Sequence, residues 1–208
     1  GTMDDIISLT PKARFIIEIL VVLVLIYSNN YSLDDFHGLW NIDTIPNWLS
    51  IPLTVFACVG IINAINLIDG IDGSASSLAF LILGTFAFLY YELKSQLFCL
   101  ISTSLSGALL AFFFYNYWGK IGKTKIFMGD SGSLFLGYII AYLAIKYQMS
   151  NHTGGFPYRE ESMLISFSLV FIPCIDVIRV ALQRKLNKKD MFEADKTHIH
   201  HRIMQMGL

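Results

Sequence analysis

The sequence predicts an all-α fold, a polytopic bundle of about six transmembrane helices. Of its 208 residues, 54% are hydrophobic and only 15% are charged. Soluble domains usually carry about 45–50% apolar and roughly 25% charged residues, and a water-soluble chain of this size could not bury so much apolar surface in one core. The apolar residues also form long continuous runs without strict alternation, which favours helices over a barrel.

Each predicted helix is an apolar run close to the about 20 residues that cross a hydrocarbon core about 30 Å thick. Any one of the shorter runs would also suit a buried helix of a soluble protein, but their succession within one chain favours a membrane. The expected spans are residues 13–28, 46–67, 75–91, 97–118, 134–149 and 163–182.

The segments between the spans form two alternating sets. The first comprises residues 1–12, 68–74, 119–133 and 183–208, and the second comprises residues 29–45, 92–96 and 150–162. Cytoplasmic loops carry an excess of Lys and Arg, so the first set is predicted to face the cytoplasm. In or beside the first set are Lys12, Arg14, Lys120, Lys123, Lys125, Arg179, Arg184, Lys185, Lys188, Lys189, Lys196 and Arg202, against Lys94, Lys146 and Arg159 for the second.

Clusters of acidic, amide or histidine residues lie in the first set, at residues 4–5, 63–72, 129–133 and 198–201. Two predicted spans separate each cluster from the next, so all of them emerge on the same face of the membrane. We therefore predict one composite site at the cytoplasmic surface. The net charge of −1 gives no general attraction for nucleic acid, and the sequence carries no DNA- or RNA-binding signature.

Two of these clusters suit a hard divalent cation and phosphate. Asp4 and Asp5 are adjacent carboxylates, and Mg²⁺ typically takes one or two carboxylates plus substrate phosphates. A solvated pair that caps the helix beginning near residues 10–11 is the alternative. Asp130 lies in FMGDSGSLFLG, where flanking glycines allow close backbone approach and Ser131 or Ser133 can cap a helix whose N-terminus favours phosphate. A plain turn before a helix is the alternative there.

The other two clusters are less specific by themselves. In NAINLIDGIDG, Asn63 and Asn66 share a face if the helix continues to residue 67, and Gly70 and Gly73 then end it. A calcium loop is excluded because the 12-residue ligand pattern is absent. The segment DKTHIHHR has the histidines of a zinc site without the usual complement of ligands, so a phosphate-contacting loop is preferred. On the opposite face, Asp34, Asp35 and His37 are expected in a solvated, hairpin-like loop rather than a metal site.

Residues 4–5 and the motifs NAINLIDGIDG, FMGDSGSLFLG and DKTHIHHR resemble, in order and spacing, the polyprenyl-phosphate N-acetylhexosamine-1-phosphate transferase superfamily, glycosyltransferase family 4. The HIHH form resembles the undecaprenyl-phosphate GlcNAc-1-phosphate transferase branch. One departure is Ser8, which stands where that branch often has the third acidic residue of DDxxD. Because family members have more spans, the resemblance implies that residues 1–208 are a single integral-membrane transferase domain truncated at both ends.

The resemblance implies transfer of a sugar 1-phosphate, expected to be GlcNAc-1-phosphate, from a UDP-sugar to undecaprenyl phosphate with release of UMP. This would be the first membrane step of cell-envelope polysaccharide synthesis, in the bacterial inner membrane with the active site on its cytoplasmic face. Mg²⁺ is the implied cofactor, with Mn²⁺ as an alternative, and a homodimer is left open. The implied catalytic and metal-binding residues are Asp4, Asp5 and Asp130. The implied substrate-binding residues are Asn63, Asn66, Asp69, Asp72, Lys125, Phe127, His198, His200 and His201.

Two rival functions predict different patterns. A transporter or channel would place ionisable residues near the midplane of several spans, whereas only Glu18 stands clearly inside one, where we expect it to pack inward against a polar partner. A CDP-alcohol phosphotransferase would show DG-x-x-A-R, and neither Asp69-Gly70 nor Asp72-Gly73 is followed by it.

Overall fold

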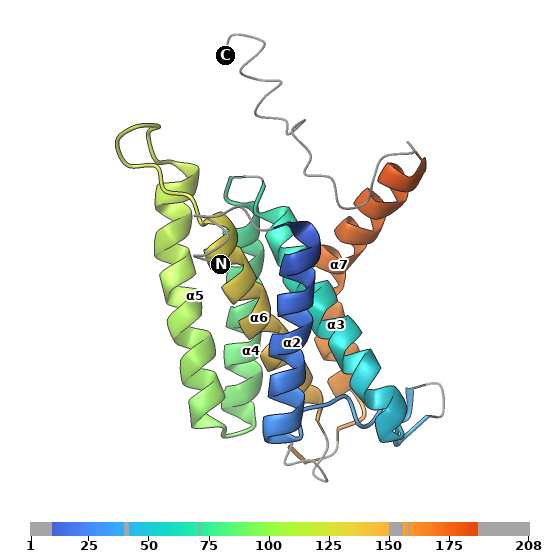
Figure 1. Ribbon diagram of the computed structural model, residues 1–208. Coiled ribbons are helices and arrows are strands. Elements are labelled where there is room, and N and C mark those ends of the chain that lie inside the picture. Colours follow the sequence, from blue (N-terminus) through green and yellow to red (C-terminus); the bar gives the residue numbers. More distant parts are fainter. Residues whose placement is uncertain (1–9, 40–41, 71, 150–155, 158, 187–208) are drawn as a thin grey trace.

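The computed structural model describes residues 10–39, 42–70, 72–149, 156–157 and 159–186. These residues form helices that run alternately up and down through one bundle (Figure 1). All the predicted spans are helical, and the all-α prediction is confirmed. The helices are α2 (Pro11–Asn29), α3 (Asn47–Ile68), α4 (Ser74–Glu92), α5 (Gln96–Tyr117), α6 (Gly129–Gln148) and α7 (Ser162–Leu186).

The bundle has the exposed apolar surface of a multi-pass membrane protein. Among the described residues, α3, α4 and α5 are long and apolar enough to cross a membrane by length and composition, and α7 contains a shorter apolar stretch. Leu97, Leu100 and Phe114 of α5 are 62%, 66% and 52% exposed. Such side chains suit contact with lipid, since a contiguous apolar surface of this kind would be unfavourable in water.

Local sequence explains where the helices begin and end. Thr10 is the N-cap of α2, its hydroxyl accepts a hydrogen bond from the Ala13 amide at 3.4 Å, and Pro11 occupies the first helical position. α3 ends at Ile68, as the sequence predicts to within a residue. α6 begins at Gly129 rather than at residue 134, because GDSGS forms its first turn instead of a preceding loop.

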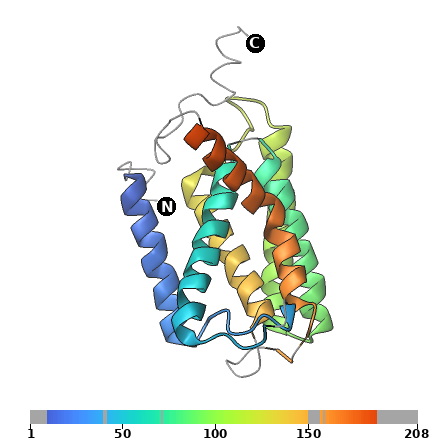
Figure 2. The same cartoon turned by 90° about the vertical axis from the view of Figure 1, so that its right-hand side faces the viewer.

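The centre of the bundle is the crossing of α3 with α6, which α7 also contacts, while α2 packs on α3 and α4 packs on α5 (Figure 2). Gly137 lies at this crossing. A Cβ added there would stand 2.8 Å from the Ile62 Cα, so only glycine permits this separation of the two backbones. The close crossing brings the last turns of α3 beside the first turn of α6.

The loop between α2 and α3 lies at the lower end of Figure 1, away from the predicted site. An antiparallel bridge joins Asp35 to Thr44, so the hairpin-like form is confirmed. The expectation that this loop is solvated is wrong, because Asp35 and His37 are 6% and 3% exposed. The Asp35 carboxylate accepts the His37 amide at 2.5 Å, and the His37 ring contacts the Gln148 carbonyl at 2.6 Å, which fastens the loop to α6.

Candidate active site

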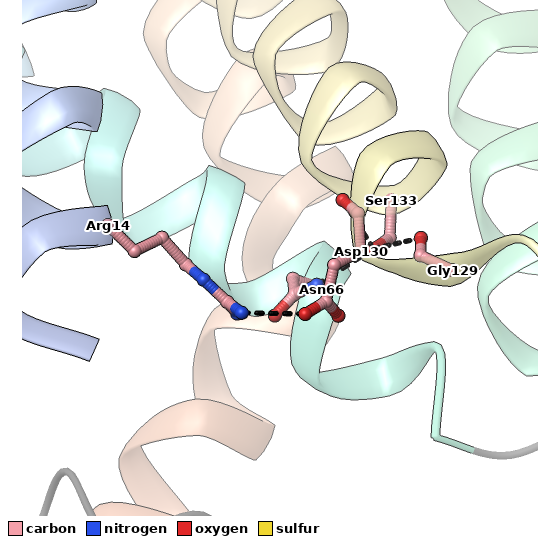
Figure 3. Close-up of polar contacts among 5 residues, drawn as sticks. All are labelled: Arg14, Asn66, Gly129, Asp130 and Ser133. Atoms are coloured by element: carbon pink, nitrogen blue, oxygen red, sulfur yellow. Dashed lines mark hydrogen bonds and ion pairs between the residues drawn. The ribbon is translucent and has the colours of Figure 1, made fainter. Parts of the chain in front are cut away.

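An ion pair between α2 and α6 lies at the upper end of the bundle. The Arg14 guanidinium donates to the Asp130 carboxylate with 2.6 Å between Nη2 and Oδ2 (Figure 3). The Asp130 side chain is 44% exposed, so its carboxylate stays accessible from solvent. A charge-assisted hydrogen bond of this kind fixes the direction of the carboxylate as well as neutralising it.

Asn66 ties the C-terminal part of α3 to the same carboxylate. Its Nδ2 donates to Asp130 Oδ1 at 3.2 Å and to Ser133 Oγ at 2.8 Å (Figure 3). Ser133 is fully buried, and its hydroxyl donates to the Gly129 carbonyl at 3.0 Å. The expectation that Ser131 or Ser133 caps α6 is therefore wrong, because Met128 is the N-cap and both serines lie inside the helix. Ser133 bonds back to the backbone of the first turn. The two motifs that hold Asn66 and Asp130 are in direct contact.

Asn63 lies one turn deeper on α3 and faces Glu18 of α2. Its Nδ2 donates to Glu18 Oε2 at 2.5 Å and to the Val59 carbonyl at 2.9 Å. Glu18 is 8% exposed, so the expectation that it packs inward against a polar partner is confirmed. The Asn63 amide donates within the protein, which pins α2 to α3 below the surface of the site.

Asp69 directly follows α3 and is half-buried. Burial, together with the negative charges of Asp130 and Asp72, raises the pKa of its carboxyl to about 7. Three acidic side chains, two from the α3–α4 connection and one from the first turn of α6, therefore lie within electrostatic reach of one another. Such mutual repulsion is typical of carboxylates gathered for a cation or a proton transfer.

An ion pair between Lys125 and Asp72 connects the α5–α6 loop to the α3–α4 loop. The Lys125 ammonium also lies 5.6 Å from the centre of the Phe127 ring. The Phe127 side chain is 71% exposed, which leaves a flat aromatic surface beside a cation at the edge of the site. An exposed aromatic ring of this kind can stack on a planar base.

Several predicted site residues lie outside the described residues. They are Asp4, Asp5, His198, His200 and His201. The structure brings Asn66, Asp69, Asp72, Lys125, Phe127 and Asp130 to one end of the bundle and gives Asn63 a place just beneath them.

The described residues carry the ligand chemistry that Mg²⁺ prefers, although among them no three acidic, histidine or cysteine side chains converge on one point. Asp130 offers an accessible carboxylate. Burial and then the negative charges of Asp130 and Asp72 raise the pKa of Asp69, and a divalent cation would offset those charges. Mg²⁺ takes one or two carboxylates and completes its shell with water and phosphate oxygens. The donor set fits that pattern.

Sequence reasoning missed Arg14 as a site residue, since its charge was used only to orient the chain in the membrane. The signal was its position on α2, one turn before Glu18 on the same face. Glu18 faces α3, so a cation at residue 14 also points toward α3 and the motifs at its end.

Comparisons with known proteins place the chain in a family. Residues 1–148 match the model of the family described as glycosyl transferase family 4. The chain is 37% identical over 209 residues to a probable undecaprenyl-phosphate N-acetylglucosaminyl 1-phosphate transferase of Bacillus subtilis, covering 100% of this chain and 55% of that protein. It is 28% identical over 211 residues to an undecaprenyl-phosphate alpha-N-acetylglucosaminyl 1-phosphate transferase of Yersinia pestis, with 100% and 55% covered. A decaprenyl-phosphate N-acetylglucosaminephosphotransferase of Mycobacterium tuberculosis is 31% identical over 176 residues, covering 76% of this chain and 41% of that protein. The chain thus spans about half the length of the curated relatives it matches.

Proposed function

The chain belongs to glycosyl transferase family 4, and we propose that the protein containing it transfers GlcNAc-1-phosphate from UDP-GlcNAc to undecaprenyl phosphate, releasing UMP. The names of its relatives support the sugar and the lipid. The observation that carries the proposal is the contact of Arg14 and Asn66 with Asp130, because it joins three chain segments around one accessible carboxylate.

In the proposed reaction, a phosphate oxygen of the lipid forms a bond to the β-phosphorus of the UDP-sugar. The bond from that phosphorus to the bridging oxygen breaks, and UMP leaves with the bridging oxygen. Both substrates are anionic, so the protein must chiefly neutralise charge and hold the reacting groups in line. Arg14 adds positive charge beside Asp130, and the two side chains fix each other's direction.

The residues around Lys125 suit the nucleotide. Phe127 is proposed to stack on uracil, and Lys125 to offer its charge to the phosphates in exchange for Asp72. Asn66, Asp69 and Asp72 are proposed to line the nucleotide-sugar site, and Asn63 is proposed to support that site from beneath through its hydrogen bond to Glu18. Of the residues outside the described ranges, Asp4 or Asp5 is proposed to take the proton of the lipid phosphate, and His198, His200 and His201 to contact phosphate and sugar.

Asp130 is the residue proposed to hold Mg²⁺ (or Mn²⁺), with Asp4 and Asp5. When bound, the ion would supply charge neutralisation on the diphosphate and on the departing UMP. The fit rests on the accessible Asp130 carboxylate and on the negative charge gathered around Asp69.

The proposed location is the bacterial inner membrane, with the site on its cytoplasmic face, and the step is proposed to open cell-envelope polysaccharide synthesis. Arg14 and Lys125 lie at the site end of the bundle, whereas the α4–α5 turn that holds Lys94 lies at the opposite end (Figure 1). This distribution supports the orientation that an excess of cytoplasmic Lys and Arg predicts. A homodimer stays a proposal.

The test uses the full-length protein in membranes, with UDP-GlcNAc, undecaprenyl phosphate and Mg²⁺, and measures UMP release. We expect release that needs both the lipid and the divalent ion, and that Asp130→Asn lowers by at least about 10²-fold. The matched control is Asp43→Asn, an exposed residue of the opposite loop, which should keep wild-type turnover. Wild-type turnover by Asp130→Asn would contradict the site, and release from UDP-GalNAc but not UDP-GlcNAc would contradict the sugar.

A further inference from the structure

A buried asparagine at the end of α5 contacts both the α3–α4 loop and the α5–α6 loop, which carry residues of the candidate site. Asn116 is 6% exposed and lies in the last turn of that helix. Its Oδ1 accepts the Gly73 amide at 2.6 Å, and its Nδ2 donates to the Ile126 carbonyl at 2.8 Å. One side chain therefore joins backbone groups that are 53 residues apart in the sequence.

Those two backbone groups are the direct neighbours of site residues. Gly73 follows Asp72, and Ile126 lies between Lys125 and Phe127. The ion pair of Lys125 with Asp72 spans the same junction. The position of Asn116 thus sets the separation of the two segments from which the cation, the carboxylate and the exposed ring project.

The backbone at Gly73 has little freedom to move away. Its φ is +76°, and an added Cβ would stand 3.0 Å from ring atoms of both Phe113 and Tyr117. Those rings stack on each other with 5.5 Å between their centres. At Gly73 the α3–α4 connection therefore packs closely against the Phe113 and Tyr117 rings of α5 and is hydrogen-bonded to Asn116 of the same helix.

The α5–α6 loop is held together by hydrogen bonds of its own. Its backbone folds back at Lys120, whose carbonyl accepts amides from residues 123–125, and the Lys120 amide donates to Thr124 Oγ1 at 2.9 Å. At Gly119, an added Cβ would stand 2.6 Å from the Lys125 Cα. The loop is a compact unit, and the bond from Asn116 to Ile126 attaches its exit to the helix.

We propose that Asn116 is a positioning residue that holds Lys125 and Phe127 in the geometry that binds the nucleotide of the substrate. The proposal rests on the proposed function. Asn116 acts through two backbone groups that adjoin the residues proposed to bind the nucleotide. Its contribution is therefore expected in the KM for the UDP-sugar more than in kcat.

Two substitutions separate this role from a general effect on folding. Asn116→Asp keeps an acceptor for Gly73 but faces the Ile126 carbonyl with a second oxygen, and Asn116→Ala removes both bonds without adding charge. The matched control is Thr124→Val, which removes the bond inside the loop and leaves both Asn116 contacts. Amide hydrogen exchange of the α3–α6 crossing shows whether each full-length variant keeps its fold.

Amide exchange in peptides covering residues 72–77 reports the bond to Gly73 directly. We expect roughly tenfold faster exchange there in Asn116→Ala, no change in Asn116→Asp, and no change in Thr124→Val. Asn116 with its hydrogen bonds to Gly73 and Ile126 forms what we call the loop clamp. Unchanged exchange in Asn116→Ala would overturn the clamp whatever reaction the protein catalyses.

Steady-state UMP release tests the consequence. Both Asn116 variants should raise the KM for UDP-GlcNAc by about tenfold, with a smaller effect on kcat. In the Lys125→Ala background the effect of Asn116→Asp should shrink to below about threefold, because the residue acts through that side chain. Full additivity, or an unchanged KM, would overturn the positioning role. Absence of UMP release by the wild-type protein with any UDP-sugar would overturn the proposed function and with it this kinetic role, while the exchange result would still decide the clamp.

Discussion

The Arg14 guanidinium and the Asp130 carboxylate meet at 2.6 Å although 116 residues separate them in the sequence. They come from the first turns of α2 and α6, and Asn66 reaches the same carboxylate from the end of α3. The ion pair is the point at which separate sequence motifs become one site.

Arg14→Ala should lower kcat/KM for UMP release by about 10²-fold, because it removes both the charge beside Asp130 and the bond that orients the carboxylate. Arg14→Lys should recover part of the loss, since lysine restores charge without the planar fork. The control is Lys12→Ala, an exposed cation on the same helix. An equal loss in Lys12→Ala would assign the effect to surface charge.

Asp69 makes stability depend on pH. Its folded pKa is about 7, above the ordinary 3.8, so the folded state binds the proton more tightly than the unfolded state does. Its stabilising contribution is therefore complete below about pH 4 and is lost as the pH rises through 7. In EDTA, the Tm of the wild type should fall more than that of Asp69→Asn between pH 5 and pH 8. Parallel pH profiles of Tm for the two proteins would contradict the shift.

Gly137→Ala should destabilise the bundle by about 1–3 kcal/mol, because its Cβ would stand 2.8 Å from the Ile62 Cα and must force α3 and α6 apart. The matched control is Gly60→Ala on α3, where a Cβ meets no atom within 4 Å and alanine favours the helix. Thermal unfolding in detergent measures both variants. UMP release at a permissive temperature should also fall in Gly137→Ala, because Asn66 would move away from Asp130.

Asn63 and Asn66 should behave differently despite sharing a motif. Asn63→Ala breaks the hydrogen bond to the buried Glu18, so it should lower the Tm while leaving the KM for UDP-GlcNAc within about twofold. Asn66→Ala should lower kcat/KM by at least about tenfold with a smaller change in Tm, because it frees the Asp130 carboxylate. A raised KM in Asn63→Ala at unchanged Tm would instead assign Asn63 to the substrate.

Phe127→Leu should raise the KM for UDP-GlcNAc by about tenfold, since stacking on a base contributes about 1–3 kcal/mol. Phe127→Tyr keeps the ring and should stay near the wild-type value. Phe135→Leu is the control, because Phe135 is a similarly exposed ring on α6, at 58%. Binding of UMP by calorimetry should follow the same order as the KM values.

The sequence predicted the helices well because their apolar runs are long and their ends carry clear signals, such as Thr10-Pro11 and Gly73. It predicted the start of α6 less well. GDSGS looks like a loop by composition, but Asn66 and the Gly129 carbonyl satisfy Ser133 inside a helical turn. It also predicted a solvated outer loop, whereas the bonds among Asp35, His37 and Gln148 bury that loop's polar groups.

The sequence by itself determined that the chain is a helical membrane protein, and it predicted that the polar motifs emerge at one end because two spans separate each motif from the next. The number of spans between two motifs decides whether they lie on the same side of the membrane. Only the tertiary structure decided which helices are neighbours and which way each side chain points, through contacts such as Gly137 against Ile62. For this reason Asp130 was predictable from its motif, whereas its partner Arg14 and the loop clamp at Asn116 emerged only once the helices were packed.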